Sequence, residues 1–265
     1  MKIQIAALVA TLMATSCANK ATQPTTAAET DVKIIALHDK QSHAMPNNLF
    51  YGQDSTYKSL VDSLNPSGAI PASMGCFYVN LGEPTLFDAG LGAMLGGGID
   101  SALAANNINA DSIRTIFITH CHADHIGGLL NADGKAKYAN ADVWVPKVEY
   151  DYWLGKYDQV KQIFDAYKPE KVHYYNYSEQ MPLNVVAIPT PGHTPGHTAY
   201  RVGKNLIAGD FMHGMLVQKQ HPEISCQYDE NKQQAAEARK DILKMATDSS
   251  LTVYGMHLPD DGILR

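Results

Sequence analysis

The chain contains 265 residues, 45% of them hydrophobic, and its formal net charge is −6. This length and hydrophobic content are sufficient for the core of one sizeable α/β domain. The acidic balance and the lack of Lys/Arg clusters argue against a nucleic-acid partner, which would need a basic surface.

The N-terminal segment, residues 1–17, is predicted to be a signal peptide. Its apolar run, residues 3–14, is too short to cross a membrane as a helix. Cys17 follows small residues and resembles the lipidated cysteine of a bacterial lipobox; a plain secretory signal and a cytosolic N-terminal helix are the alternatives. We therefore expect an exported protein, anchored to the membrane by a lipid on this cysteine and facing the periplasm or the cell exterior. Residues 18–31 are expected to form a flexible tether, and residues 32–265 the globular domain.

The first part of this domain alternates patterns typical of strands and helices. Residues 39–58 are mixed and polar and are expected to form a loop that leads into a helix. The glycine-rich residues 92–98 are expected to form a loop near the site, because their spacing is too irregular for a phosphate-binding motif. Strands are expected at 32–37, 76–81, 85–87, 114–119 and 141–145, helices at 57–64 and 99–106, and a short helix from Ile126 onward.

The second part begins with an aromatic segment, residues 148–157, which carries three tyrosines and Trp153. These side chains either line a substrate pocket or pack a helix, and the sequence leaves both interpretations open. Further strands are expected at 185–188, 198–202, 205–208 and 251–254, and the clearest helix at 230–245.

One short motif carries the most chemical information. It reads His120-Cys121-His122-Ala123-Asp124-His125 and follows the predicted strand at 114–119. Imidazole and carboxylate ligands together suit Zn²⁺. His120 and His122 are two residues apart and point the same way on extended backbone, whereas Asp124 and His125 lie where a helix begins and can face a second point. One loop can therefore offer two ligands to each of two metals, unless the histidines are a chance surface cluster. Cys121 points away from them and is expected to pack in the core.

Three later residues can complete such a site. His193 lies in a Pro/Gly turn, Asp210 directly follows a predicted strand, and His257 follows another. Taken singly, each is equally well interpreted as a ligand or as an ordinary loop residue, and Asp210 also as a turn residue or a helix cap. The carboxylate of Asp210 is suited to bridge two metals, since it can give one oxygen to each. His197, the second histidine of the same turn, is expected to be structural.

The pattern His-x-His-x-Asp-His, then His, then Asp, then His resembles the metallo-β-lactamase superfamily over about residues 70–258. This resemblance implies a four-layer αββα sandwich with the site between the two sheets. It also implies two Zn²⁺ or other divalent ions per chain. His120, His122 and His193 would hold the first, Asp124, His125 and His257 the second, and Asp210 would bridge them. In this superfamily, an Asp at the place of Asp88 commonly supports the ligands from behind; a simple turn residue is the alternative.

A finer resemblance follows Asp210. Residues 209–213, 221–224 and 235–239, with Asp229, resemble the branch that contains bacterial methyl parathion hydrolase, within a group that also holds acyl-homoserine lactonases. The lactonases have Tyr where this chain has His213, so we expect His213 to contact the substrate. After the final His, residues 258–262 are acidic where that branch is apolar, which argues against a strongly apolar organophosphate.

The resemblance implies a dinuclear zinc hydrolase of ester-like bonds in a small molecule: a lactone, a carboxylic ester or a phosphotriester. A hydroxide shared by the two metals would be the nucleophile, and Asp124 is expected to accept a proton as the product forms. A β-lactamase, a thioesterase, a metal-binding oxidoreductase of this fold and a non-catalytic metal-binding protein are the alternatives. A homodimer is expected because many relatives dimerise.

Overall fold

The computed structural model describes residues 32–52 and 55–265. The predicted signal peptide, the lipobox Cys17 and the predicted tether all lie outside the described residues. None of the helices in the described ranges combines the length and the apolar character needed to span a bilayer.

Six strands form the first sheet, in the spatial order β1-β3-β4-β5-β6-β7. The first three pair antiparallel, and the pairs from β4 to β7 are parallel. Parallel strands that are apolar and buried on both faces are typical of α/β proteins, and their carboxyl ends meet at one edge of the sheet. The bounds of these strands are β1 Ile34–Pro46, β3 Ala69–Asn80, β4 Pro84–Phe87, β5 Thr115–Phe117, β6 Asp142–Pro146 and β7 Val172–Tyr175.

The second sheet has four strands in the order β12-β10-β9-β8. Only β10 and β12 pair parallel, and the residues after β8, β10 and β12 carry the later candidate ligands. Its strands are β8 Val186–Pro189, β9 Thr198–Val202, β10 Asn205–Ile207 and β12 Thr252–Tyr254. A separate two-stranded sheet joins β2 Phe50–Tyr51 to β11 Ser225–Cys226.

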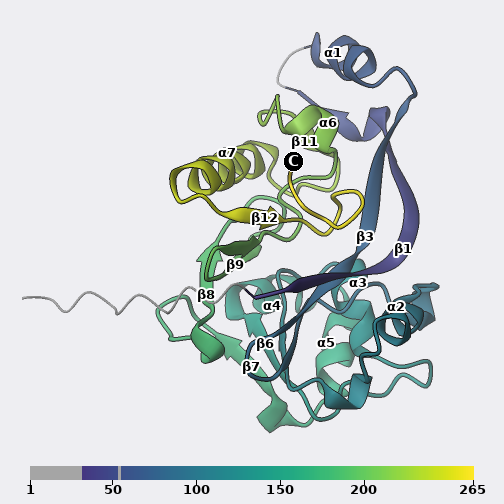
Figure 1. Cartoon of the computed structure of the whole chain (residues 1–265), viewed down its shortest axis with the longest axis vertical. Coiled ribbons are helices and arrows are strands. Elements are labelled where there is room, and N and C mark those ends of the chain that lie inside the picture. The colour runs from purple at the N-terminus through teal and green to yellow at the C-terminus, as the bar shows by residue number, and fades with distance from the viewer. Residues whose placement is uncertain (1–31, 53–54) are drawn as a thin grey trace, which may run out of the picture.

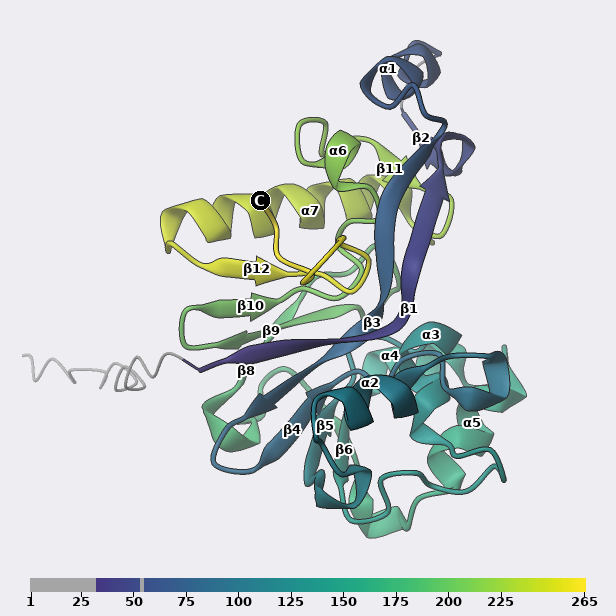
Figure 2. The same cartoon turned by 45° about the vertical axis from the view of Figure 1, so that its right-hand side comes forward.

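The helices cover the outer faces of the two sheets, as Figures 1 and 2 show. α2, α4 and α5 lie on the side of the first sheet, and α7 lies on the second. The side chain of Asn231 caps α7 by accepting a hydrogen bond from the backbone N–H of Gln234. The α-helices are α1 Tyr57–Leu64, α2 Ile99–Ala105, α3 Ala123–Ile126, α4 Lys147–Trp153, α5 Asp158–Asp165, α6 Met215–Gln218 and α7 Lys232–Asp248.

Three apolar clusters hold these layers together. The one between the two sheets contains an aromatic group from both, in which Phe87, Phe117 and Tyr200 have ring centroids 5.3 to 5.6 Å apart. Another lies between the first sheet and its helices, and a third joins the second sheet to Ile242 of α7. The order helix, sheet, sheet, helix is the predicted four-layer αββα sandwich.

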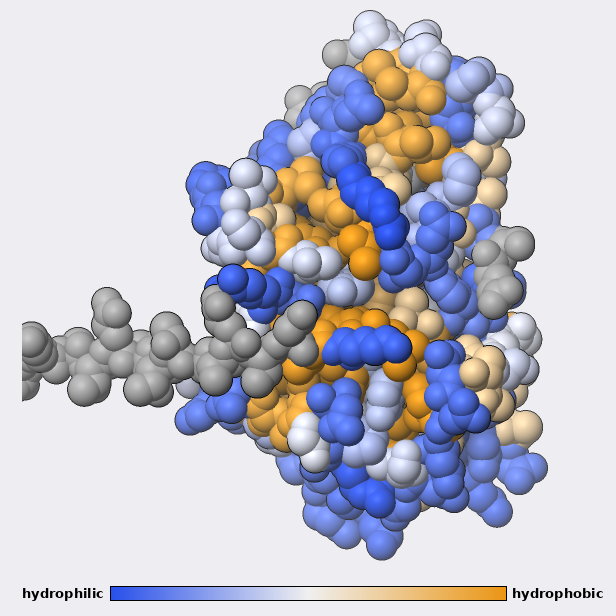
Figure 3. Space-filling view, viewed as in Figure 1, coloured by the Kyte–Doolittle hydropathy of each residue, from blue (hydrophilic) through white to orange (hydrophobic). Residues whose placement is uncertain are grey.

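The prediction of a loop over residues 39–58 is wrong for its first half. β1 continues to Pro46 and pairs with β3, with Met45 opposite Ile70, so that β1, β3 and α1 form an arm beyond the sandwich (Figures 1 and 2). A small apolar cluster that includes Val61 of α1 fills its base. Hydrophobic residues reach the surface of the arm on the face shown in Figure 3. The pairing depends on partners distant in sequence and on register shifts after His38, which a local pattern does not reveal.

Two further differences concern the first sheet and its helices. α5 and β7 were not predicted, although α5 buries an apolar face through Val160, Ile163 and Phe164. The helix expected from Ile126 onward begins earlier, at Ala123, and already carries Asp124 and His125.

Candidate metal centre

Three imidazole nitrogens converge at the ends of β5 and β8. Nε2 of His120 lies 3.1 Å from Nδ1 of His122, and Nε2 of His193 lies 3.2 Å from the first and 3.0 Å from the second. A tetrahedral Zn²⁺ with Zn–N bonds of about 2.0–2.1 Å holds its nitrogen ligands about 3.4 Å apart. The triangle therefore has the size that one metal ion requires.

A second group forms beside it from α3 and the end of β12. Oδ2 of Asp124 lies 3.6 Å from Nε2 of His125 and 3.4 Å from Nε2 of His257. The side chain of Asp124 is 20% exposed, whereas those of the two histidines are buried. This carboxylate therefore combines a place among the candidate ligands with access to solvent.

Asp210 lies between the two groups. Its Oδ1 is 3.2 Å from Nε2 of His125, and its Oδ2 is 3.0 Å from Nε2 of His257 and 3.4 Å from Nε2 of His193. The preceding residue must be glycine: Gly209 has φ +53°, and a Cβ there would lie 2.6 Å from Nε2 of His197. The structure thus brings all seven predicted ligands together, in two sets that share Asp210.

The ring nitrogens that point toward the centre have lone pairs available for a cation. The second ring nitrogen of each of four histidines faces an acceptor, so its N–H is fixed there and Nε2 keeps its lone pair toward the centre. Nε2 of His125 and Oδ1 of Asp210 are buried and make no hydrogen bond in the described part of the chain. A divalent cation is the partner that this donor set fits. The four outer contacts are His120 Nδ1 to Thr119 Oγ1 at 3.0 Å, His125 Nδ1 to Asp88 Oδ2 at 2.7 Å, His193 Nδ1 to Asp229 Oδ1 at 3.0 Å and His257 Nδ1 to the carbonyl of Ser73 at 2.9 Å.

The protonation states of the clustered side chains also suit the binding of a cation. Burial lowers the pKa of His120 well below its usual value and that of His122 to about 3, which keeps both imidazoles neutral as metal binding requires. Burial also opposes the charged forms of His125 and His257, but the carboxylate of Asp210 outweighs it and raises both pKa values, that of His257 to about 10. The second group therefore attracts positive charge.

Asp88 supports both groups from behind. Its carboxylate accepts hydrogen bonds from the backbone N–H and the hydroxyl of Thr119, both at 2.7 Å, and from Nδ1–H of His125 at 2.7 Å. Thr119 in turn contacts His120. Asp88 has φ +62°, a conformation that costs free energy for a residue with a Cβ and that often marks functional sites. Its position agrees with the supporting role and not with a simple turn residue.

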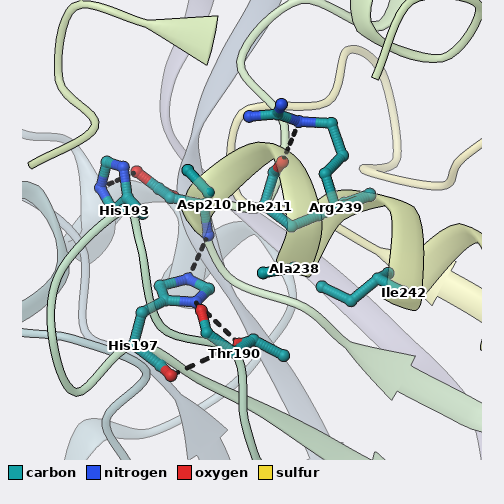
Figure 4. A pocket seen from close by; sticks show the side chains of 9 residues that line it. Thr190, His193, His197, Asp210, Phe211, Ala238, Arg239 and Ile242 are labelled. Carbon is teal, nitrogen blue, oxygen red and sulfur yellow. Dashed lines mark hydrogen bonds and ion pairs between the residues drawn. The ribbon is translucent and has the colours of Figure 1, made fainter. Parts of the chain in front are cut away.

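Figure 4 shows how the backbone of Asp210 is held. Nε2 of His197 accepts a hydrogen bond from the backbone N–H of Asp210 at 2.9 Å, and its Nδ1 lies 2.9 Å from Oγ1 of Thr190. On the other side, Nε of the buried Arg239 donates to the carbonyl of Phe211 at 2.7 Å. His197 therefore lies behind the ligand atoms, in the structural role expected for it.

His213 lies against the centre but outside both ligand sets that share Asp210. Its Nε2 is 3.3 Å from Oδ2 of Asp210, and its ring stacks on that of His257 at a centroid distance of 5.0 Å. Its backbone N–H donates to Oε1 of Gln218 at 2.8 Å. Nδ1 of His213 is buried and makes no hydrogen bond within the described chain. A ring fixed in this way has one free nitrogen near the candidate ligands.

A cleft of about 970 Å³ opens onto the centre. Asp124 and His213 line it, as does His43 of β1. Met94 and Leu95 of the glycine-rich loop, 59% and 53% exposed, form part of one apolar wall. The aromatic segment, residues 148–157, serves both roles that the sequence left open. Trp153 and Tyr157 line the cleft. Tyr150 packs against Phe164, and the hydroxyl of Tyr152 donates a hydrogen bond to Glu230.

Several supporting residues could not be found from the sequence. Ser73, Gln218 and Glu149 act through hydrogen bonds to residues or backbone groups of the site, and none belongs to a motif. Among the supporting residues named here, Asp229, which contacts Nδ1 of His193, is the one with a local sequence signal, because it belongs to the segments that resemble the branch of methyl parathion hydrolase.

Comparison with known proteins assigns the family. The family model of the Metallo-beta-lactamase superfamily matches residues 76–257, which is more than half of the chain. The chain belongs to this superfamily, and the resemblance seen in the sequence is confirmed.

Two curated relatives match shorter stretches. The chain is 30% identical over 151 residues to the uncharacterized protein YobT of Bacillus subtilis, a match that covers 52% of this chain and 61% of YobT. It is 34% identical over 96 residues to a hydroxyacylglutathione hydrolase of Shewanella denitrificans, covering 36% of this chain and 32% of that enzyme. Both matches therefore span less than two thirds of the relative.

Solved structures extend the likeness to most of the chain. The hydrolase AbOPH of the beta-lactamase superfamily superposes with a TM-score of 0.78 at 29% identity, covering 88% of this chain and 89% of its own. AidC, a dizinc quorum-quenching lactonase, superposes with a TM-score of 0.77 at 22% identity, covering 88% and 90%. The predicted fold class is confirmed.

Proposed function

We propose that the chain is a metal-dependent hydrolase that binds two zinc ions and cleaves ester-like bonds in small molecules. The observation that carries this proposal is the pair of ligand sets that share the carboxylate of Asp210. His120, His122 and His193 would hold one ion, and Asp124, His125 and His257 the other. The fold of the dizinc lactonase AidC supports a dinuclear site in this architecture.

When bound, two such metals supply Lewis acidity and lower the pKa of a coordinated water toward neutrality. The chain itself contributes a proton acceptor at the mouth of the cleft. Burial opposes ionisation of Asp124, but the neighbouring charges of His125 and His257 hold its pKa below the usual range, so its carboxylate is ionised. Because Asp124 is partly exposed and lines the cleft, we assign its carboxylate to accept a proton as the product forms, through the oxygen that would not bind the ion.

His213 is assigned to orient the substrate. Its Nδ1 has no hydrogen-bond partner among the described residues, and the residue lines the cleft beside Asp210. Because Nε2 of His213 faces Oδ2 of Asp210 at 3.3 Å, the proton of a neutral ring lies on Nε2, and Nδ1 can accept a hydrogen bond from an N–H or O–H group of the substrate. Burial lowers the pKa of His213 and favours this neutral form.

The cleft favours an uncharged substrate. Its described lining contains no lysine or arginine, whereas Asp229 and Glu230 both contribute to it. β-Lactams and glutathione thioesters carry carboxylates, which would lack a cationic side chain to pair with in this lining. Lactones, simple esters and phosphotriesters need no such partner. A thioesterase remains the second candidate, because one curated relative is a hydroxyacylglutathione hydrolase.

The test uses the full-length chain, first with its metal quantified and then with a panel of substrates. We expect turnover of an uncharged lactone, nitrophenyl ester or phosphotriester that is lost on chelation and restored by zinc. A cephalosporin and a glutathione thioester serve as charged comparators, and preference for the thioester would support the second candidate. Turnover that survives removal of all metal would refute the proposal.

A further inference from the structure

Glu149 is a fully buried carboxylate that belongs to neither ligand set. It lies in α4 and uses both oxygens as acceptors. An unpaired buried charge is costly, so a carboxylate in such a place needs strong donors. The four donors are Cys121 N at 2.9 Å and Trp153 Nε1 at 2.6 Å to Oε1, and Thr194 Oγ1 and Gly196 N, both at 2.8 Å, to Oε2.

Three of these donors come from the two loops that present the first ligand set, and the fourth, Trp153, comes from α4 itself. Cys121 lies between His120 and His122, and Thr194 follows His193. One carboxylate thus ties together two segments about 70 residues apart in the chain, whose three imidazole nitrogens meet within 3.2 Å.

The packing around Glu149 leaves little freedom for movement. A Cβ added at Gly196 would lie 2.5 Å from the backbone N of Glu149, so this turn rests directly on α4. Trp153, the fourth donor, packs its ring edge-on to His122 at a centroid distance of 5.3 Å. The same carboxylate therefore fixes the backbone on both sides of the first set and an aromatic ring against one of its ligands.

The second ligand set is supported differently. His125 is held by Asp88, and His257 by the carbonyl of Ser73. The four hydrogen bonds of Glu149 all go to residues on the side of the first set. Loss of Glu149 should therefore act on one half of the centre.

We propose that Glu149 is a positioning residue that fixes the geometry of the His120, His122 and His193 set and thereby the metal affinity of that set alone. This inference rests on the metal binding of the proposed function and not on any particular substrate. Mutation of residues that orient metal ligands typically costs about 10- to 100-fold in metal affinity.

The test is a metal titration of the full-length Glu149→Gln variant. Glutamine keeps the shape but replaces one acceptor oxygen by an NH₂ group, which would face an N–H donor in either orientation. We expect one of two zinc affinities to fall about 10- to 100-fold, while the other stays as in the wild type. Titration with Co²⁺ should show loss of the visible absorption of one site and retention of the other.

Two further variants keep the inference testable if Glu149→Gln folds poorly. Thr194→Val removes a single donor at nearly constant volume and should weaken the same site by a smaller factor. Asp142→Asn makes the same carboxylate-to-amide change in a partly exposed pair with His173, outside the ligand loops, and should leave both affinities unchanged.

The outcomes separate this inference from the proposed function. Equal weakening of both sites, or affinities unchanged in Glu149→Gln and Thr194→Val, would overturn the role of Glu149 while leaving the hydrolase intact. A wild-type chain that binds no metal would overturn both. A wild-type chain that binds two metals without hydrolysing any substrate would overturn the hydrolase, and selective loss in Glu149→Gln would still support the inference.

Discussion

Replacing Asp88 by asparagine should expose how tightly the imidazole tautomers are controlled. Asp88 accepts three hydrogen bonds, from the N–H and the hydroxyl of Thr119 and from Nδ1–H of His125. Asparagine has a single acceptor oxygen, so its NH₂ group must face either the backbone N–H of Thr119 or the Nδ1–H of His125.

Each orientation has a different cost. Facing Thr119 leaves a buried backbone N–H without an acceptor, at about 1–3 kcal/mol of stability. Facing His125 favours the tautomer with the proton on Nε2, the atom that points at Asp210 and would bind metal. We therefore expect the zinc affinity of the second set to fall about 10- to 100-fold, which corresponds to about 1.4–2.7 kcal/mol.

The assay is zinc competition with a chromophoric chelator, supported by ¹⁵N NMR of the imidazole tautomers. Asp142→Asn is a matched control, because Asp142 accepts from Nε2 of His173 at 2.7 Å in a partly exposed pair outside the site. An Asp88→Asn variant that binds zinc as tightly as Asp142→Asn, with Nδ1 of His125 still protonated, would show that Asp88 does not control the tautomer of His125.

Three further predictions concern the cleft and the core. His213→Phe should lower turnover about 100-fold while both metals stay bound, as measured by kcat beside metal content; loss of metal in parallel would contradict a role in orienting the substrate. Met94→Ser should raise KM about 3-fold or more for an octanoyl ester and leave KM for an acetyl ester unchanged, since it removes apolar wall from the cleft. In a Cys17→Ser chain, the buried thiols of Cys76, Cys121 and Cys226 should resist a thiol reagent at pH 8, because burial raises their pKa values, that of Cys226 to about 12; rapid labelling of the native protein would contradict this.

The ligand residues could be predicted from the sequence because they lie in short segments with recognisable spacing. His120 and His122 follow shortly after the buried strand β5, with His122 on extended backbone, and Asp210 follows Gly209, where a Cβ would collide with the ring of His197. Such positions leave local signals in spacing and in glycine. His197 could be assigned a structural role because it is the second histidine of the Pro/Gly turn that carries the ligand His193.

The supporting residues and the arm depend on contacts distant in sequence. The carbonyl of Ser73 and the ring of His257 are 184 residues apart, and Glu149 is one of two acidic residues on an otherwise ordinary helix. β1 beyond His38 pairs through register shifts with a strand that begins at Ala69. Neither a hydrophobic period nor a motif marks these features, since tertiary packing alone creates them.

The two ligand sets that share Asp210 should hold two metal ions in one chain. Native mass spectrometry of the full-length chain, made metal-free and titrated with zinc, tests this most directly. We predict two zinc ions per wild-type chain and one per chain in a His257→Ala variant, whose first set is complete. A wild-type chain that saturates with one zinc ion or none would contradict the shared centre.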